Sequence, residues 1–307
     1  MKKKVSIIGA GNVGATTAQL IAQSGLADIV LFDVVEGMPQ GKALDIAEAC
    51  PLWGSSSIVA GTNSYEETAL SDIVVVTAGL ARKPGMSRSD LLEANAKIIR
   101  NVSTEIAKTS PHCILIIVTN PMDVMAQLAW KTTEFSCKKV MGMGGILDAA
   151  RLRTFISFEF NVSPEDVEAL VFGGHGDDMV PMPRFSTVKG VPITELMPKK
   201  KIEKLIERTR NGGAEIVSLL KTGSAYYAPA ASAFQMVKSI LLDERRTLPC
   251  AAYLNGEYGV KDLYMGVPVI LGKEGVEKVI EVKLTKDEKA QFKKSCASVK
   301  KLVEKLT

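Results

Sequence analysis

The sequence predicts an α/β protein in which a doubly wound parallel sheet forms the first half of the chain and an α+β domain forms the second. The 307 residues are enough for two domains of ordinary size. Over residues 1–144, short β-branched runs alternate with helix-length amphipathic segments, which is the pattern of βαβ units in a parallel sheet. Over residues 145–307, long helical patterns are mixed with extended segments. We therefore expect two closely apposed domains that divide after residue 144.

The first half contains short apolar runs that are typical of buried parallel strands. The expected strands are Lys4–Ile8, Ile29–Asp33, Ile73–Thr77, Ile114–Thr119 and Val140–Met143, with a further short strand over Ser57–Gly61. Between these runs, apolar residues recur at helical spacing. The expected helices are Val13–Ser24, Met38–Ala49, Asp90–Lys108 and Met122–Thr132.

The second half is dominated by longer helical patterns. Expected helices cover Asp148–Glu159, Lys199–Leu220, Ala225–Leu242 and Thr285–Leu306, and extended segments cover Cys250–Tyr258 and Val267–Gly272. Ser163, followed by Pro164 and two acidic residues, has the features of an N-cap at a helix start. The lysine-rich stretch 198–210 also contains glutamates at helical spacing, so we interpret it as a solvated helix face rather than a polyanion-binding patch.

Composition and charge exclude several classes of function. Lys and Arg number 38 against 34 Asp and Glu, a balance that indicates neither a disordered polyelectrolyte nor a dedicated nucleic-acid-binding protein. No apolar run is long enough for a membrane helix, so we expect no membrane partner. The five cysteines are scattered and never in CxxC spacing, which predicts reduced thiols in a cytoplasmic protein without a metal site.

A glycine-rich motif, GAGNVG over residues 9–14, follows the first expected strand and opens the first expected helix. This arrangement is typical of a Rossmann-type fold, in which backbone N–H groups at the helix N-terminus hold a pyrophosphate. The second expected strand ends at Asp33, nineteen residues after Gly14, where a carboxylate can accept hydrogen bonds from both ribose hydroxyls of an adenosine. The same carboxylate would repel a 2′-phosphate. The motif therefore predicts NAD, rather than NADP, as cofactor.

The chain contains two histidines, which limits the search for a proton-transfer group. His112 precedes an expected buried strand, and we interpret it as a loop residue. His175 lies among glycines in GGHGDD, which leaves its imidazole unshielded. Asp148 and Arg151, three residues apart on one helix face, form either a local ion pair or a functional set in which Asp148 orients the histidine and Arg151 grips a substrate carboxylate.

Two further segments leave the carboxyl ends of expected strands, where ligands bind in sheets of this kind. The segment Thr77–Arg88 contains three cations, two hinge-like glycines and a proline, which suits either a mobile lid over the site or a solvated basic loop. Asn120 in Thr119–Pro121 offers an amide to the crevice, although Asn-Pro turns also occur without function.

Taken together, these motifs resemble the lactate/malate dehydrogenase superfamily, and within it the prokaryotic-type, lactate-dehydrogenase-like malate dehydrogenases. GAGNVG, TAGLARKPGMSR, VTNP, GGHGDD and GSAYYAPAAS stand in the family's order and cover essentially the whole chain. The resemblance implies NAD contacts from residues of the glycine motif, of two strand ends and of one expected helix. These are Gly9, Ala10, Gly11, Asn12, Val13, Gly14, Asp33, Asn95, Val118, Thr119 and Asn120.

The resemblance also implies catalytic and substrate-binding roles. His175 is the implied proton carrier, Asp148 its partner, and Arg151 the clamp on the carboxylate next to the reacting carbon. The remaining implied substrate contacts are Arg82, Arg88, Asn120 and Ala225. Arg82 stands where lactate dehydrogenases commonly have glutamine, which implies a dicarboxylate substrate, and Arg88 is the implied group that polarises the reacting carbonyl.

The resemblance therefore implies reversible oxidation of (S)-malate to oxaloacetate by NAD, in a homotetramer built from dimers. L-lactate dehydrogenase or a dual-specificity 2-hydroxy acid dehydrogenase is the nearest alternative. Two other classes remain open at this stage. An NAD-dependent glycoside hydrolase can share a related fold but is expected to use metal-linked Cys and His residues, and a non-catalytic NAD-binding regulator would not need the complete set of motifs.

Overall fold

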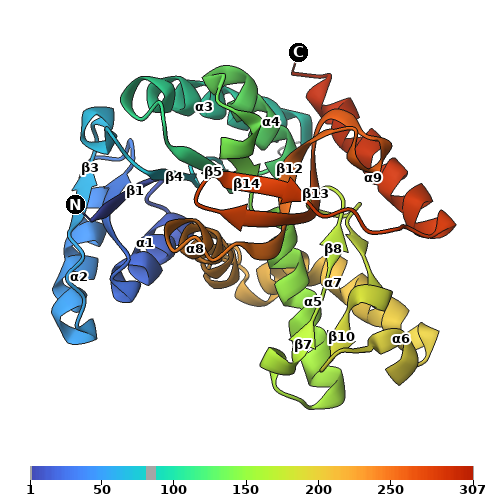
Figure 1. Cartoon of the computed structure of the whole chain (residues 1–307). Coiled ribbons are helices and arrows are strands. Elements are labelled where there is room, and N and C mark those ends of the chain that lie inside the picture. The colour runs from blue at the N-terminus through green and yellow to red at the C-terminus, as the bar shows by residue number, and fades with distance from the viewer. Residues whose placement is uncertain (1, 81–87, 307) are drawn as a thin grey trace.

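The computed structural model describes residues 2–80 and 88–306, and the side chain of Arg88 lies outside this description (Figure 1). A central sheet of nine strands runs through both halves of the described chain. Its strands lie, in spatial order, as β14 (Gly275–Val279), β13 (Lys261–Gly272), β12 (Arg246–Asn255), β6 (Val140–Gly142), β5 (Ile114–Ile117), β4 (Ile73–Val76), β1 (Lys3–Ile8), β2 (Ala27–Phe32) and β3 (Val59–Thr62).

The six strands from β3 to β6 are mutually parallel and follow the order of a doubly wound sheet, with the reversal between β1 and β4. Helices α3 and α4 lie on one face of this sheet, and α1 and α8 lie on the other (Figure 1). The helices of the first half are α1 (Asn12–Ser24), α2 (Met38–Trp53), α3 (Arg88–Thr109) and α4 (Met122–Thr133). The expected α/β class is confirmed.

The second half continues the same sheet instead of forming a separate one. Strand β12 pairs antiparallel with β6 through Ala251 and Gly142, and β13 and β14 follow as an antiparallel meander. The chain passes from one half to the other at the start of α5, so the sheet crosses the expected division after residue 144. The helices of this half are α5 (Gly144–Phe160), α6 (Ile193–Leu196), α7 (Lys199–Leu220), α8 (Tyr227–Leu241) and α9 (Lys286–Val303).

Short strands complete the second half. A three-stranded sheet joins β11 (Val191–Pro192), β10 (Thr187–Val188) and β7 (Val167–Glu168), and a two-stranded ladder joins β8 (Val171–Phe172) and β9 (Val180–Pro181). The segment between β8 and β9 carries the GGHGDD motif. Because an isolated bridge ties Gly173 to Gly266 of β13, this turn is held against the central sheet.

Several expected boundaries differ from the structure. Helix α5 begins four residues before Asp148, and β13 begins six residues before the expected Val267. Strand β14 was not expected. Ser163 is an N-cap, as expected, but it caps a single 3₁₀ turn instead of a longer helix, and the chain then enters β7.

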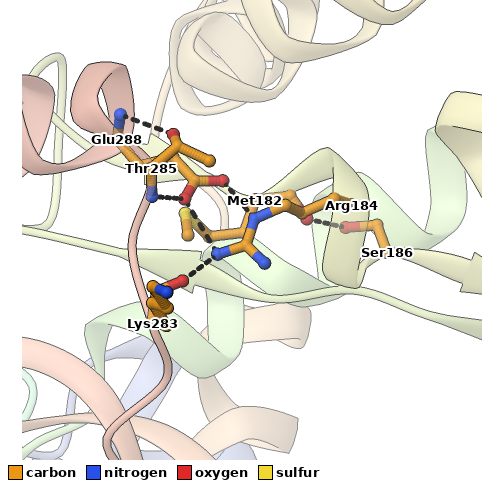
Figure 2. A network of polar contacts seen from close by, with 6 residues as sticks. All are labelled: Met182, Arg184, Ser186, Lys283, Thr285 and Glu288. Carbon is orange, nitrogen blue, oxygen red and sulfur yellow. Dashed lines mark hydrogen bonds and ion pairs between the residues drawn. The ribbon is translucent and has the colours of Figure 1, made fainter.

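Helix α9 is fixed at its N-terminus by a capping box and an ion pair (Figure 2). Thr285 Oγ1 accepts a hydrogen bond from the backbone N–H of Glu288, and the Glu288 carboxylate accepts one from the Thr285 N–H. Arg184 donates to both carboxylate oxygens of Glu288, at 2.7 and 2.9 Å, and to the carbonyl of Lys283. These bonds fix α9 where its buried face packs behind the β8–β9 turn.

Across the described residues, no helix combines the length and apolar character needed to cross a membrane.

Candidate active site

The glycine motif forms a tight turn between β1 and α1. Gly9 has a φ of +109°, and a Cβ atom there would lie 2.6 Å from the backbone nitrogen of Ala78. A Cβ atom at Gly14 would lie 1.8 Å from the carbonyl oxygen of Gly9, whereas one at Gly11 would meet no described atom within 4 Å. Gly11 is the N-cap of α1, and as a glycine it places no side chain over the first helical turn. The backbone is thus open at Gly11 beside the N–H groups of the first helical turn, which suits a pyrophosphate.

Asp33 follows β2 and lies against this turn. Its Oδ2 accepts a hydrogen bond from the N–H of Ala10 at 2.7 Å, and its Oδ1 accepts one from the N–H of Val35 at 3.0 Å. Lys42 of α2 donates to the carbonyl of Ala10 at 2.8 Å. The carboxylate is therefore held beside the glycine motif, where an adenosine ribose would lie if the pyrophosphate bound at α1.

The carboxyl ends of β4 and β5 are linked through Asn95 of α3. The Asn95 side chain is buried, and its oxygen accepts from the N–H of Leu80 at 2.7 Å while its nitrogen donates to the carbonyl of Asn120 at 2.7 Å. Thr119 donates its hydroxyl to the carbonyl of Ala78 at 2.7 Å. These bonds hold the ends of two neighbouring parallel strands together at the ligand-binding edge of the sheet.

The structure brings His175 and Asp148 into contact across 27 residues of sequence. His175 Nδ1 lies 2.8 Å from Asp148 Oδ2, and the two side chains are 13% and 2% exposed. Burial on its own lowers the pKa of His175, but the carboxylates of Asp148 and Asp123 outweigh burial and raise that pKa above its usual value. The pair can therefore carry a proton near neutral pH, with Nε2 as the nitrogen that Asp148 leaves free.

Arg151 lies one helical turn after Asp148 and is only weakly paired with it. Its Nη1 is 3.4 Å from Asp148 Oδ1, and its Nε is buried without a hydrogen-bond partner among the described residues. Burial lowers the pKa of Arg151, and Asp148 opposes that shift. Helix α7 provides space for this side chain, because Cβ atoms at Gly212 and Gly213 would lie 3.1 and 3.3 Å from Arg151 atoms. Of the two interpretations of the Asp148–Arg151 spacing, the geometry favours the functional one, in which Arg151 retains donors for an anion.

The structure also places residues at the site that the sequence analysis missed. Asp123 Oδ2 accepts a hydrogen bond from the N–H of His175 at 2.7 Å, and Ser295 Oγ accepts one from the N–H of Gly174 at 2.9 Å. A signal for Asp123 was present, since it is the single charged residue in the apolar run 121–130. No local pattern indicated Ser295 or the glycine pair of α7.

The other expected site residues are only partly placed. Arg82 and the Arg88 side chain lie outside the described residues. Ala225 is half-buried just before α8, and Val118 is buried at the end of β5. His112 lies in an exposed turn before β5, at the opposite end of that strand from Asn120, as its interpretation as a loop residue requires.

The chain belongs to the lactate/malate dehydrogenase family. The model of that family's NAD-binding domain matches residues 3–142, and the model of its alpha/beta C-terminal domain matches residues 146–307. Among similar proteins, the malate dehydrogenase of Heliobacterium modesticaldum is 56% identical over 302 residues, which is 98% of each chain.

Solved structures support the same relationship. The malate dehydrogenase of Picrophilus torridus in its apo form is 50% identical, with a TM-score of 0.97 over 99% of this chain and 97% of that one. The lactate dehydrogenase of Cryptosporidium parvum, complexed with lactic acid and nicotinamide adenine dinucleotide, is 41% identical, with a TM-score of 0.97 over 100% of this chain and 98% of that one.

Proposed function

We propose that this chain is an NAD-dependent malate dehydrogenase, which catalyses reversible hydride transfer between (S)-malate and NAD to give oxaloacetate and NADH. The family and the full-length relatives named malate dehydrogenase at 54–56% identity support this activity. The observation that carries the proposal is the buried His175–Asp148 pair beside Arg151, whose Nε is unpartnered within the described part of the chain. A proton carrier and a carboxylate-binding cation are the two groups that oxidation of a 2-hydroxy acid requires.

In the direction of malate oxidation, neutral His175 accepts the proton of the substrate hydroxyl at Nε2, because its Nδ1–H is held by Asp148. The Asp148 carboxylate stabilises the imidazolium that forms. When NAD is bound, its nicotinamide supplies the acceptor for the hydride that leaves C2. In the reverse direction, the imidazolium returns the proton to the forming alkoxide.

Arg151 binds the carboxylate next to the reacting carbon. The planar guanidinium can donate two parallel hydrogen bonds to a carboxylate. The Arg151 Nε is buried without a partner among the described residues, so a bound carboxylate would satisfy it. Asn120 and Ala225 complete the proposed substrate contacts, from the end of β5 and the start of α8. By resemblance, Arg82 pairs with the second carboxylate of the substrate, and Arg88 stabilises negative charge on the reacting oxygen.

NAD binds along the carboxyl edge of the parallel strands in this proposal. The glycine motif at the N-terminus of α1 would hold the pyrophosphate, and Asp33 would accept hydrogen bonds from the ribose hydroxyls. Val118, Thr119 and Asn120 at the end of β5 lie along the nicotinamide half. The Asn95 side chain donates a hydrogen bond to the carbonyl of Asn120 and so fixes the end of β5.

A lactate dehydrogenase or dual-specificity enzyme is the second candidate, because a lactate dehydrogenase superposes on this chain as well as a malate dehydrogenase does. The backbone therefore does not separate the two activities. The test is kcat/KM with oxaloacetate and with pyruvate, each with NADH. We expect oxaloacetate to be strongly preferred, and equal or better use of pyruvate would favour the second candidate.

Arg82→Gln gives the residue-level test of this choice. Losing one charged partner in a desolvated site typically costs about 2–5 kcal/mol, so we expect oxaloacetate efficiency to fall roughly 30- to 5,000-fold. Pyruvate efficiency is expected to stay level or rise. An unchanged ratio of the two efficiencies would mean that Arg82 does not select the substrate.

We also propose that the chain assembles as a homotetramer, a dimer of dimers, in the cytoplasm. Leu44 and Leu52 of α2 are 61% and 87% exposed, and Tyr227 at the start of α8 is 71% exposed, which supports association through these helices. All five cysteines are free thiols, as expected in a reducing compartment. Light scattering is expected to give four times the 33.0 kDa chain mass, and a monomer would refute the assembly.

A further inference from the structure

The turn that carries His175 is held by three consecutive backbone N–H groups, each bound to a different element. The N–H of Gly173 donates to the carbonyl of Gly266 in β13 at 2.9 Å. The N–H of Gly174 donates to Ser295 Oγ in α9, and that of His175 donates to Asp123 Oδ2 in α4. Two of these acceptors are neutral, and Asp123 is the charged one. A neutral amide oxygen would hold the turn equally well, so the hydrogen bond alone does not account for a carboxylate at this position.

The Asp123 carboxylate is placed at a cost to the fold. Asp123 is 4% exposed, and its Oδ1 is buried without a hydrogen-bond partner in the described part of the chain. Burial raises the pKa of Asp123 to about 6, while the N–H and charge of His175 oppose the rise. Asp123 is therefore mainly ionised at neutral pH, and the group placed to compensate its charge is the imidazolium of His175.

The described charged groups that act on the imidazole come from two packed elements, and a third element, α9, adds a neutral thiol that interacts with Asp123. Helix α5 contributes Asp148 and Arg151, and α4 contributes Asp123. Helix α9 contributes Cys296, whose thiol is kept neutral because burial, with Asp123 as a second cause, raises its pKa to about 12. Among the described residues, two carboxylates and one guanidinium thus act on the ring, and the imidazolium brings the summed charge of these groups to zero.

We propose that Asp123 is a positioning residue for His175, holding the backbone of the histidine turn through Oδ2 and acting with Asp148 as a second negative charge that stabilises the imidazolium. This inference rests on the proposed function, in which His175 carries the proton. The carboxylate of Asp148 contacts the ring at Nδ1, whereas that of Asp123 acts from the backbone side of the same residue. Oxaloacetate reduction consumes the imidazolium, so the charge of Asp123 extends that reaction to higher pH.

The test is the pKa of His175, measured directly by NMR on protein labelled with ¹³C at histidine Cε1. The chain has two histidines, so the spectrum contains two signals, and a His112→Asn sample assigns them. We expect Asp123→Asn, which keeps an acceptor for the His175 N–H but removes the charge, to lower the pKa of His175 by roughly one unit. Ser295→Ala is the matched control. It removes the neighbouring anchor of the same turn without changing charge, and we expect it to leave that pKa within about 0.3 unit.

Kinetics give the second readout. In Asp123→Asn, the pH at which kcat/KM for oxaloacetate reduction falls by half is expected to move down by the same amount as the NMR pKa, while the Kd for NADH stays unchanged. An Asp123→Asn variant whose His175 titrates as in the parent protein would overturn the proposal, as would equal pKa shifts in Asp123→Asn and Ser295→Ala. The NMR measurement needs no substrate, so absence of oxaloacetate turnover in the parent protein would count against the proposed function alone.

If Asp123→Asn does not fold, the same interaction can be measured from the other partner. Two interacting charges shift each other's titration equally, so His175→Asn is expected to raise the pKa of Asp123, followed through its ¹³Cγ signal. An unchanged titration of Asp123 in that variant would overturn the proposal.

Discussion

The contact between Asp148 and His175 leads to the most detailed prediction. Asp148→Asn keeps the size of the side chain and removes its charge at a buried site where Oδ2 lies 2.8 Å from Nδ1. The amide oxygen can still accept from Nδ1–H, but the imidazolium loses an opposite charge in direct contact. If the amide rotates to donate to Nδ1, the ring proton is forced onto Nε2 and the tautomer needed for malate oxidation is lost.

The size of the effect follows from this geometry. An opposite charge at contact distance shifts a pKa by about 1–3 units, equivalent to about 1.4–4 kcal/mol. Arg151 cannot compensate, because its positive charge opposes the imidazolium and lowers the pKa of His175. We therefore expect kcat/KM for oxaloacetate reduction at pH 8 to fall roughly 10- to 1,000-fold. At pH 6, where the variant still forms imidazolium, the loss is expected to be smaller.

The assay is kcat/KM for oxaloacetate with NADH from pH 5.5 to pH 9 in both proteins, with the Kd for NADH as the control for an intact dinucleotide site. The high-pH limb, set by His175, is expected to move to lower pH in Asp148→Asn. A uniform loss with the limb in its original position would show that Asp148 only packs against the ring, and would refute the electrostatic reasoning.

Three further predictions concern proton transfer, cofactor choice and stability. His175→Asn is expected to lower kcat by about 10²–10⁴-fold with NADH binding retained, whereas His112→Asn, in an exposed turn, keeps the parent kcat. Asp33→Ser is expected to lower kcat/KM with NADH by roughly 10- to 100-fold without an equal loss with NADPH; parallel losses would place Asp33 away from the ribose. Because burial raises the pKa of Asp123 from 3.8 to about 6, the folded protein binds more protons than the unfolded chain between these values, and its stability falls as pH rises through them. Asp123→Asn is therefore expected to raise the free energy of unfolding more at pH 8 than at pH 4, with a difference of at most about 3 kcal/mol between the two pH values. Thermal unfolding at both pH values measures it, and a stability gain that does not depend on pH would contradict the raised pKa of Asp123.

The sequence by itself determined the parallel half of the fold and the glycine turn at its edge. Buried parallel strands are continuous apolar runs, and the helices between them repeat at 3.6 residues, so both patterns are local and readable. The glycine motif is equally local, because its backbone turn needs glycine at Gly9 and Gly14 whatever the rest of the chain does. Asp33 and His175 could be proposed as site residues for the same reason, each from its immediate neighbours.

Only the tertiary structure decided how the second half joins the first. The pairing of β12 with β6, which makes one sheet of nine strands, joins segments more than a hundred residues apart and leaves no periodic signal in either. The contact of Asp148 Oδ2 with His175 also became visible only in the structure, because sequence spacing left both a local ion pair and a catalytic set open. Asp123 went unnoticed because its hydrogen bond is to a backbone N–H 52 residues away. Hydrogen bonds and charge interactions depend on distance in space, and that distance is set by packing rather than by sequence spacing.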